Sequence, residues 1–413
     1  MAAGNLFAIF GDKEEEKMYS QKMYELGSKK STIRTIFEYG KQRAAIVGEE
    51  NIYDFSLGNP NVPTPEFVKQ AIIDILNEED PCDVHGYTVA AGDPKVRETL
   101  ADSINERFGT NFSMQNLFMT AGAAASITIC FKALAEEGDE FITFAPYFPE
   151  YKCFVESVGS KLNVVPANIE TFQINFEKFE EMINEHTKAV IINSPNNPSG
   201  VVYSEDTIKK LAEILTKKSD EYGHPVFIIS DEPYREVVYD GAEVPYVTKY
   251  YANTLVCYSY SKSFSLAGER IGYIVVPNEV SEFADIYAAV AGAARVLTHV
   301  NAPSLFQKVV ARCAGKPSDI SIYEKNRELL YNGLVEAGIA CVKPEGAFYL
   351  FPRTLEDDDR AFCEKAKAYD LLLVPGSDFG CPGHFRASYC IKTSTIEKSL
   401  PVFKKFVKEV YGI

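Results

Sequence analysis

A lysine flanked by small hydroxyl residues marks a segment of the sequence that is well suited to chemistry. Lys262 comes just after the apolar run 254–258, and Arg270 follows it by eight residues. Open α/β sheets bind their ligands at the carboxyl ends of their strands, so a lysine in this place can reach a bound molecule. Its amine could serve as a nucleophile or carry a proton. Taken by itself, the segment is more typical of a surface loop.

Two further apolar runs end in polar residues of other kinds. One leads to Asp231, with Tyr234 three residues later, and another leads through a proline-rich turn to Asn197. A fourth segment, 120–125, carries only small side chains ahead of a helical pattern. Because the carboxyl ends of parallel strands meet at one edge of a sheet, these residues together indicate one composite site.

The elements that must position this site alternate along the chain. Short β-branched runs alternate with amphipathic segments, which predicts an α/β domain with a largely parallel sheet. Beyond about Pro303 the pattern changes to helices and short strands, which predicts a second, smaller α+β domain. The runs predicted to be buried strands of the larger domain are 189–193, 226–230, 254–258 and 272–276.

Capping residues predict the bounds of three helices. Thr64 is a candidate N-cap for the first. Asp93 opens the second, which should stop at Gly109. Ser204 opens the third, which should end at 217–218, where two lysines suit the negative end of the helix dipole.

Length and charge set the broad class of the protein. The chain has 413 residues, enough for two or three domains and for a core that needs no disulfide or metal. Its 42 basic and 58 acidic residues give a net charge of −16, which argues against nucleic acid or an anionic membrane surface as a partner. The substrate stays open, because a single buried arginine can bind an anion on an acidic protein.

Cysteine usage and the N-terminal residues bear on the compartment. Nine unevenly spaced cysteines without a C-x-x-C pair favour reduced thiols and a cytoplasmic location. Residues 1–17 have no basic segment ahead of their apolar residues, so no signal peptide is expected. The longest uncharged stretch, 110–131, contains too many polar residues to cross a bilayer. Cys381 and His384 form a lone C-x-x-H that is interpreted as a turn, and no metal site is expected.

Several well-known motifs are missing from the sequence. No two glycines are separated by a single residue, so the dinucleotide-binding G-x-G-x-x-G fingerprint is absent. The phosphate-binding loop G-x-x-x-x-G-K-[ST], the zinc motif H-E-x-x-H and the hydrolase motif G-x-S-x-G are absent as well. Nicotinamide dehydrogenases, P-loop enzymes, zincins and α/β-hydrolases therefore become poor candidates.

Taken in order, the motifs resemble those of the class I/II aminotransferases, pyridoxal-phosphate-dependent enzymes of fold type I that include aspartate aminotransferase. The resemblance runs from about Ser56 to Arg386, some four-fifths of the chain. The segments that carry it are Ser-Leu-Gly58-Asn-Pro, His-Gly-Tyr87-Thr-Val-Ala-Ala-Gly92, Ala-Gly122-Ala-Ala, Asn-Asn197-Pro-Ser-Gly, Asp231-Glu-Pro-Tyr234, Ser259-x-Ser-Lys262, Arg270 and Arg386-Ala-Ser.

The resemblance implies a particular architecture. A large domain with a mostly parallel, seven-stranded sheet covered by helices would bind pyridoxal 5′-phosphate, and a smaller α+β domain would follow it. The corresponding bounds are residues 51–302 and 303–413, with residues 1–50 as an N-terminal arm that packs with the small domain. The family also implies a homodimer with shared active sites.

The same resemblance assigns roles around the cofactor ring. Lys262 would form the aldimine with the cofactor aldehyde and later move a proton between two substrate carbons. Asp231 would keep the pyridine nitrogen protonated, so that the ring can accept electrons. Tyr234 and Asn197 would hydrogen-bond the 3′-oxygen and tune the pKa of the aldimine. Tyr147 matches the aromatic residue that stacks on the ring, with its neighbour Phe148 as the alternative.

Phosphate and substrate would be held by other residues. The phosphate would bind to a helix start at Gly122, Ala123 and Ala124, to the Ser259 hydroxyl, to Arg270, and to Tyr87 of the partner subunit. Arg386 would clamp the α-carboxylate of the substrate bidentately, and Gly58 would let that carboxylate approach the backbone. Arg386 lies on the predicted small domain, which suggests that this domain closes on the substrate.

The favoured function is a transaminase that moves an amino group between an L-amino acid and a 2-oxo acid by a ping-pong mechanism. A carbon–sulfur β-lyase or an enzyme like aminocyclopropane-carboxylate synthase would use the same residues and is the alternative. A pyridoxal-binding regulator is disfavoured, because the first 50 residues include many acids and there is no room for a winged helix ahead of Ser56. Aspartate is a weak preference as donor; Arg295, Arg34 and Arg43 are candidate partners for a second carboxylate.

Overall fold

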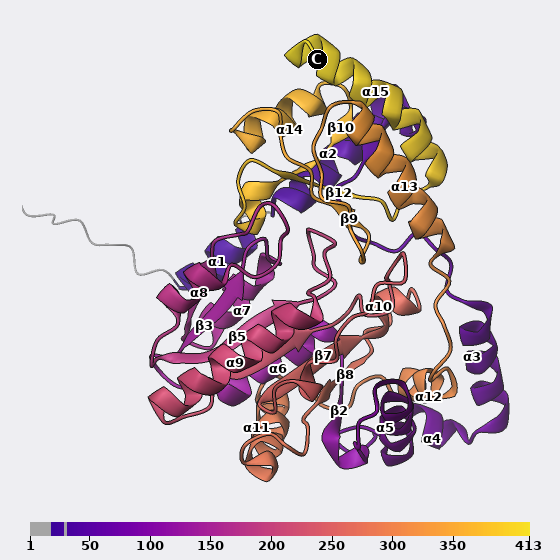
Figure 1. Ribbon diagram of the computed structural model, residues 1–413. Coiled ribbons are helices and arrows are strands. Elements are labelled where there is room, and N and C mark those ends of the chain that lie inside the picture. The colour runs from indigo at the N-terminus through magenta and orange to yellow at the C-terminus, as the bar shows by residue number, and fades with distance from the viewer. Residues whose placement is uncertain (1–17, 29–30) are drawn as a thin grey trace, which may run out of the picture.

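The computed structural model describes residues 18–28 and 31–413 (Figure 1). The expectation about a signal peptide in residues 1–17 lies outside these residues. The helices are α1 (Gln21–Ser28), α2 (Thr32–Val47), α3 (Glu66–Glu78), α4 (Pro81–His85), α5 (Pro94–Phe108), α6 (Ala123–Leu134), α7 (Glu150–Ser157), α8 (Phe176–Met182), α9 (Glu205–Tyr222), α10 (Tyr260–Ser263), α11 (Phe283–Val296), α12 (Ser304–Arg312), α13 (Ser321–Glu336), α14 (Asp359–Lys367) and α15 (Thr393–Tyr411). The strands are β1 (Tyr53–Asp54), β2 (Leu117–Thr120), β3 (Glu140–Phe144), β4 (Lys161–Val165), β5 (Thr187–Asn193), β6 (Phe227–Asp231), β7 (Thr254–Ser259), β8 (Gly272–Val275), β9 (Tyr349–Leu350), β10 (Leu371–Leu372), β11 (Val374–Pro375) and β12 (Phe385–Ser388).

A seven-stranded sheet forms the centre of the larger part of the molecule. Its strand order is β2-β8-β7-β6-β5-β3-β4, and β8 alone runs antiparallel to its neighbours. The predicted mostly parallel sheet is therefore confirmed. The four strands predicted from apolar runs are β5, β6, β7 and β8, with small differences at their ends.

Both faces of this sheet are buried, which explains why its strands are continuously apolar. Along β6, Ile229 packs into one apolar cluster together with Ile191 of β5. The preceding residue, Ile228, points to the opposite face and packs with Val190 in a second cluster. Because side chains alternate between the faces of a strand, a sheet covered on both sides needs apolar residues at every position.

Two of the three predicted helix starts have the expected caps. The Asp93 carboxylate accepts from the amides of Lys95 and Val96, and α5 ends at Gly109, which has φ 66°. Ser204 caps α9 by accepting from the Thr207 amide.

Two other details of the prediction are wrong. Thr64 is not a cap: α3 begins after Pro65, and no side chain caps it. The helix α9 also continues beyond residues 217–218 to Tyr222, because Gly223, with φ 74°, is the first residue that readily adopts the left-handed turn of a C-cap.

The remaining strands form a smaller layer beside the large sheet. Strands β11, β12 and β9 form an antiparallel sheet, and β1 pairs in parallel with β10. In Figure 1 this layer lies at the top with α2, α13, α14 and α15, apart from the seven-stranded sheet below. The pairing of β1 with β10 joins the chain just after residue 50 to its C-terminal part.

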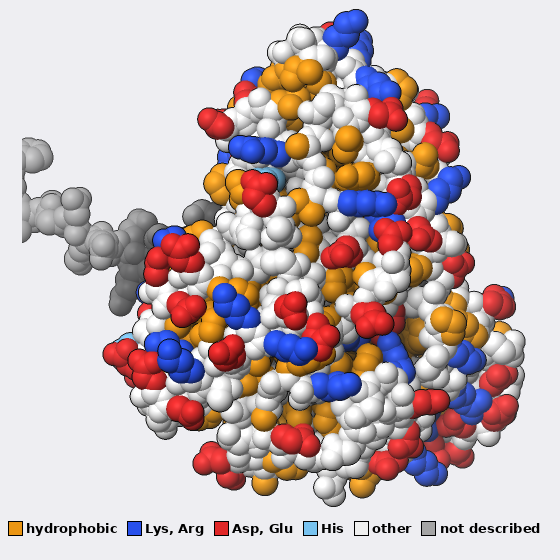
Figure 2. Space-filling view, in the orientation of Figure 1, with side chains coloured by type: hydrophobic (Ala, Val, Ile, Leu, Met, Phe, Trp, Pro, Cys, Tyr) orange, Lys and Arg blue, Asp and Glu red, His pale blue; other side chains and the backbone are white. Residues whose placement is uncertain are grey.

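The surface and the cysteines add little chemistry of their own. Figure 2 shows acidic and basic side chains interspersed over the face it presents, with apolar side chains between them. Among the described residues, no helix is long and apolar enough to cross a membrane. The nine cysteines, which all fall in the described part of the chain, are free.

Candidate active site

The predicted polar residues meet at the carboxyl ends of three neighbouring parallel strands. Asn193 at the end of β5 lies opposite Asp231 at the end of β6, and Asp231 lies opposite Cys257 in β7. Beyond β7 the chain enters the single turn of α10, which carries Lys262. This edge of the sheet is where open α/β folds bind ligands.

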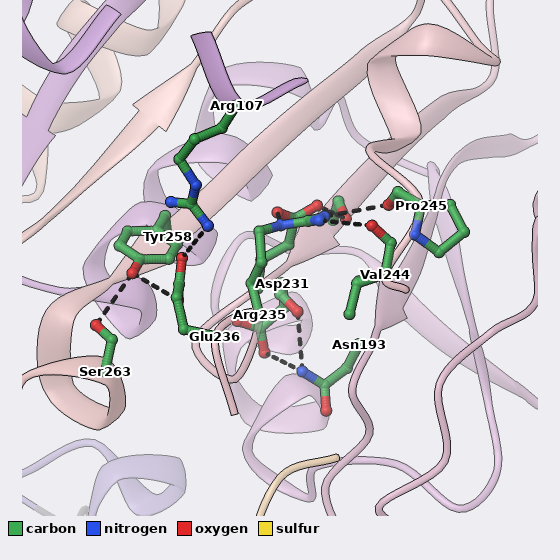
Figure 3. Close-up of polar contacts among 11 residues, drawn as sticks. Arg107, Asn193, Asp231, Arg235, Glu236, Val244, Pro245, Tyr258 and Ser263 are labelled. Atoms are coloured by element: carbon green, nitrogen blue, oxygen red, sulfur yellow. Dashed lines mark hydrogen bonds and ion pairs between the residues drawn. The ribbon is translucent and has the colours of Figure 1, made fainter. Parts of the chain in front are cut away.

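Asp231 is buried, and one of its two oxygens has no hydrogen-bond partner. Oδ2 accepts from Asn193 Nδ2 at 3.3 Å (Figure 3) and from the Tyr151 hydroxyl at 2.5 Å, whereas Oδ1 has no partner. Burial raises the pKa of the carboxyl group to about 7, although the Tyr151 hydrogen bond acts in the opposite direction. A buried acceptor without a donor is costly, so this oxygen fits a ligand that carries a positively charged N–H group.

Lys262 is held as a buried amine close to a backbone carbonyl. Its Nζ donates to the carbonyl of Gly58 at 2.7 Å and lies 5.8 Å from the ring centre of Tyr234 and 5.3 Å from that of Phe348. Burial lowers the pKa of the amine to about 8, and the positive charge of Arg386 acts in the same direction. Near neutral pH a usable fraction of the amine is therefore uncharged and nucleophilic.

Two ion-pair networks fix the backbone around Asp231 and Lys262. Arg235 donates to Glu232 at 2.5 Å and to the carbonyls of residues 244 and 245, which anchors the chain directly after Asp231 (Figure 3). In the second network, Glu236 binds Arg107 at 3.1 Å and the Tyr258 hydroxyl at 2.7 Å. Tyr258 in turn contacts the hydroxyl of Ser263, the residue after Lys262, at 3.0 Å.

The predicted phosphate site is a narrow cradle with no room for side chains. Gly122 has φ 90° and stands just before α6, whose first backbone amides have no partner within the helix. A Cβ on Gly122 would lie 3.1 Å from Arg270 Nη2, and one on Gly272 would lie 3.1 Å from Gly122 Cα. The Ser259 and Ser261 hydroxyls lie 2.8 Å apart nearby at the start of α10.

The cradle therefore combines free amides, hydroxyl groups and a guanidinium group. The predicted residues Gly122, Ala123, Ala124, Ser259 and Arg270 all belong to the elements that form it. Arg270 is exposed and donates to the carbonyl of Ala267 at 3.1 Å, so its charge is available to an anion. Helix starts with such groups bind phosphate.

Arg386 is a buried cation whose partners are neutral. On β12, it donates to Asn197 Oδ1 at 3.1 Å and to the Ser56 carbonyl, while its Nε has no partner. Its guanidinium also lies 4.7 Å from the ring centre of Tyr349 and 4.9 Å from that of Phe379. Buried charges are normally paired, so this group fits a ligand carboxylate.

The comparisons with known proteins agree with this geometry. Residues 50–402 match the model of a family described as aminotransferase class I and II. The chain belongs to this family.

Named relatives and solved structures extend the match over most of the aminotransferase. A probable aspartate/prephenate aminotransferase of Aquifex aeolicus is 31% identical over 382 residues, which is 87% of this chain and 92% of the relative. An aspartate aminotransferase of Geobacillus stearothermophilus is also 31% identical, over 384 residues, with the same coverage. A crystal structure of an amino transferase from Eubacterium rectale is 57% identical, covers 96% of this chain and 100% of its own, and has a TM-score of 0.94. The aspartate aminotransferase from Thermus thermophilus with maleate is 26% identical, with 94% and 100% coverage and a TM-score of 0.82.

The two ring-stacking candidates of this aminotransferase lie in different surroundings. Tyr147 points toward the smaller layer, because a Cβ on Gly380 would lie 2.8 Å from its ring. Phe148 packs edge-on against Tyr151, the residue that binds Asp231, with the ring centres 5.6 Å apart. The contact with Tyr151 favours Phe148, and the role of Tyr147 stays a prediction.

Residues predicted to act with a partner or on the substrate side chain are scattered. Tyr87 is 97% exposed, so it is not part of the core of the single chain. Arg295 is exposed on α11. Arg34 pairs with Glu38 at 3.5 Å, and Arg43 pairs with Asp370 at 2.8 Å. The pairing of Arg43 gives it a structural role in the described chain.

Two tyrosines in this site were missed by the sequence analysis. Tyr151 binds Asp231, and Tyr349 binds the Tyr234 hydroxyl at 2.9 Å. The only signals were an aromatic residue in the first turn of α7 and the aromatic pair Phe348-Tyr349 at the start of β9. Both signals are equally typical of core packing, so pattern alone could not have selected these residues.

Proposed function

We propose that this aminotransferase uses pyridoxal 5′-phosphate to move an amino group between an L-amino acid and a 2-oxo acid in a ping-pong reaction. This cofactor supplies an aldehyde that condenses with primary amines and a ring that accepts an electron pair when its nitrogen is protonated. The unpartnered, buried Oδ1 of Asp231 carries the proposal, because a protonated ring nitrogen is the donor that it lacks.

The other described residues fit the remaining parts of the cofactor. The helix start at Gly122, Ala123 and Ala124, together with Ser259 and Arg270, would bind the phosphate. Tyr234 and Asn197 would donate hydrogen bonds to the 3′-oxygen of the ring. The ring would rest against an aromatic side chain, with Phe148 favoured over Tyr147.

Lys262 and Arg386 would act on the substrate. The lowered pKa of Lys262 lets its amine act first as a nucleophile and then as the group that moves a proton. Arg386 would bind the α-carboxylate in place of the charge partner that it lacks, next to Gly58. Fixing that carboxylate orients the bond to be broken, which decides the reaction.

We also propose that the active enzyme is a homodimer in the cytoplasm. Tyr87 is almost fully exposed in one chain, as a residue that reaches the partner's phosphate site would be. The nine free cysteines suit a reducing compartment. Residues 51–302 and 303–413 would form the large and small domains, and the small domain would close on the substrate.

Aspartate is the first donor to test. Relatives from Aquifex aeolicus and Geobacillus stearothermophilus carry aspartate in their names. Arg295 of the partner subunit would be the candidate for the second carboxylate of such a donor.

The test is a visible absorption spectrum of the purified enzyme with pyridoxal phosphate, followed by aspartate without any oxo acid. We expect a visible band that bleaches on addition of aspartate in the wild type. A Lys262→Ala variant should not respond, whereas a control change at a surface lysine, Lys249→Ala, should behave as the wild type. The absence of any band would refute the proposed function. Release of pyruvate and ammonia from cystathionine without acceptor would identify a lyase instead.

A further inference from the structure

A direct hydrogen bond joins the smaller layer of the molecule to the cofactor side of the site. Tyr349 lies on β9, and its hydroxyl is 2.9 Å from the hydroxyl of Tyr234, which follows β6 of the large sheet. Both tyrosines are buried, and their rings meet at 78° with centres 5.8 Å apart. Two hydroxyl groups held this way share one proton between them, so one donates and the other accepts.

The same tyrosine ring supports the arginine that would bind the substrate. The guanidinium of Arg386 lies 4.7 Å from the ring centre of Tyr349. The two residues come from paired strands, since Ser388 of β12 lies opposite Tyr349 in the antiparallel ladder. A guanidinium stacked on an aromatic face is attracted to it and keeps a fixed plane.

Arg386 therefore has two connections to the residues that would hold the 3′-oxygen. One is its hydrogen bond to Asn197 at 3.1 Å. The other runs through the ring and hydroxyl of Tyr349 to Tyr234. The two connections start at Arg386 and end at Asn197 and Tyr234, so four buried side chains border the place where substrate and cofactor would meet.

The close contact with Gly58 shows how tightly Tyr349 is placed. A Cβ on Gly58 would lie 1.9 Å from the Tyr349 hydroxyl oxygen. The carbonyl of the same glycine accepts from Lys262. The glycine therefore gives Tyr349 its space, and any larger residue there would push the hydroxyl away from Tyr234.

We propose that Tyr349 is a positioning residue that donates its hydroxyl proton to Tyr234 and so leaves the Tyr234 proton free for the cofactor's 3′-oxygen. The inference rests on the proposed function and adds a second route from the substrate clamp to the cofactor. Through its ring, Tyr349 holds Arg386. Through its hydroxyl, it strengthens the hydrogen bond that Tyr234 donates.

Charge around the pair favours this direction of donation. Burial raises the pKa of both hydroxyl groups, that of Tyr349 to about 12, and the guanidinium that stacks on the Tyr349 ring lowers the pKa of that hydroxyl. The hydroxyl with the lower pKa is the better donor. Other titratable groups that face the pair are Lys262 on α10, Tyr151 on α7, Cys390 after β12 and Tyr323 on α13.

The test is a spectrophotometric pH titration of the visible band of the bound cofactor, without substrate. Hydrogen bonds donated to the 3′-oxygen stabilise its negative charge. The chromophore then holds its proton less tightly, so its pKa, and with it the pH at which the visible band titrates, is lower. In Tyr349→Phe, we expect the titration to move up by about half a unit, the size of one weakened neutral hydrogen bond. Tyr234→Phe should move it further in the same direction.

A second variant separates the ring from the hydroxyl. Tyr349→Phe keeps the ring beneath Arg386, so binding of a 2-oxo acid to the pyridoxamine-loaded enzyme should change by less than about twofold. Tyr349→Leu removes the ring as well and should weaken that binding by about threefold to tenfold, as expected for the loss of a partly buried cation–π contact. Both variants should unfold cooperatively and bind the cofactor.

Tyr323→Phe is the matched control. Tyr323 packs on Phe348, next to the pair, with ring centres 5.4 Å apart, but its hydroxyl has no hydrogen bond to Tyr234 or Tyr349. Its titration should match the wild type. An unshifted Tyr349→Phe, or an equal shift in Tyr323→Phe, would overturn the inference while the proposed function stands. A wild type without a visible band would overturn both.

Discussion

Two buried acids stand next to each other in this chain, and two buried arginines lie in the same region, but only Glu232 and Arg235 neutralise each other. Glu232 and Arg235 meet at 2.5 Å, with side chains that are 1% and 4% exposed. Asp231 and Arg386 are equally buried, yet each keeps a polar atom without a partner. The first pair is a closed structural unit. The second set is complete only with a ligand that brings a cation to Asp231 and an anion to Arg386.

This difference shows how scaffold and site can be told apart within one sheet edge. Buried charge by itself does not indicate function, because Arg235 donates to Glu232 and to two backbone carbonyls. Incomplete pairing is the informative feature, since a folded chain rarely leaves a buried polar group without a partner. An amino acid bound to pyridoxal phosphate carries both missing charges.

The largest expected effect comes from removing Arg386, the buried arginine without a charged partner. Arg386→Leu should lower kcat/KM by about 10²- to 10⁴-fold, because two hydrogen bonds to a charged carboxylate are lost. The free energy of unfolding should stay the same or rise, since an unpaired buried charge is removed. Steady-state kinetics and urea unfolding check both values. Arg353→Leu, at an exposed arginine, is the control, and a large loss of stability in Arg386→Leu would break the comparison.

Removing Arg235, which is paired with Glu232, should lower the stability of the fold and leave the activity of the folded protein nearly unchanged. Arg235→Leu leaves Glu232 buried without its partner and should lower the free energy of unfolding by about 3–5 kcal/mol. The folded fraction should keep kcat/KM within a few-fold. Arg312→Leu breaks exposed ion pairs with Glu78 and Glu79 and should cost less than about 1 kcal/mol. Equal losses in the two variants would show that the buried pair is not special.

Asp231, whose Oδ1 has no partner, should destabilise the cofactor-free protein in a pH-dependent way. Burial raises the pKa of Asp231 from 3.8 to about 7, so the folded chain binds this proton more tightly than the unfolded chain. The penalty is complete above pH 7, shrinks as the pH falls through 7, and disappears below about pH 4. Asp231→Asn should therefore raise the free energy of unfolding by about 2–4 kcal/mol at pH 8 and by almost nothing at pH 4.

Urea unfolding of the cofactor-free protein at both pH values measures this effect. The surface change Asp285→Asn is the control and should show no such dependence. Saturation with pyridoxal phosphate should stabilise the wild type more than Asp231→Asn, because the ring nitrogen then partners the carboxylate. A gain that is the same at pH 4 and pH 8 would contradict the assignment.

The smallest effect concerns Tyr151, whose hydroxyl donates to Oδ2 of Asp231. Tyr151→Phe removes the hydrogen bond to Oδ2, so the pKa of Asp231 should rise further and the carboxylate should bind the cofactor less well. Cofactor affinity should fall by about tenfold, the size of one hydrogen bond to a charged group. Absorbance titration with pyridoxal phosphate measures it. Tyr203→Phe, in a different apolar cluster, should leave the affinity unchanged.

Much of the fold and of the candidate site could be predicted because their signals are local. Apolar runs gave the strands that carry Asp231 and Lys262, and Asp93 gave the start of a helix, since a cap acts on amides two or three residues away. The end of α9 was missed, because helix-forming residues continue past 217–218 until Gly223. Tyr151 and Tyr349 were missed, because their partners lie 80 and 115 residues away.

The sequence by itself determined the elements, the order of the polar residues along them and the family that this order resembles. Those features depend on side-chain type and spacing, which the chain carries wherever it folds. Only the tertiary structure decided which buried charged groups have an oppositely charged partner and which have none. Glu232 and Asp231 are neighbours with similar chemistry, but the backbone turn after β6 brings Arg235 to one carboxylate and leaves the other facing Tyr151 and Asn193. Pairing depends on distance in space, and no local pattern encodes that distance.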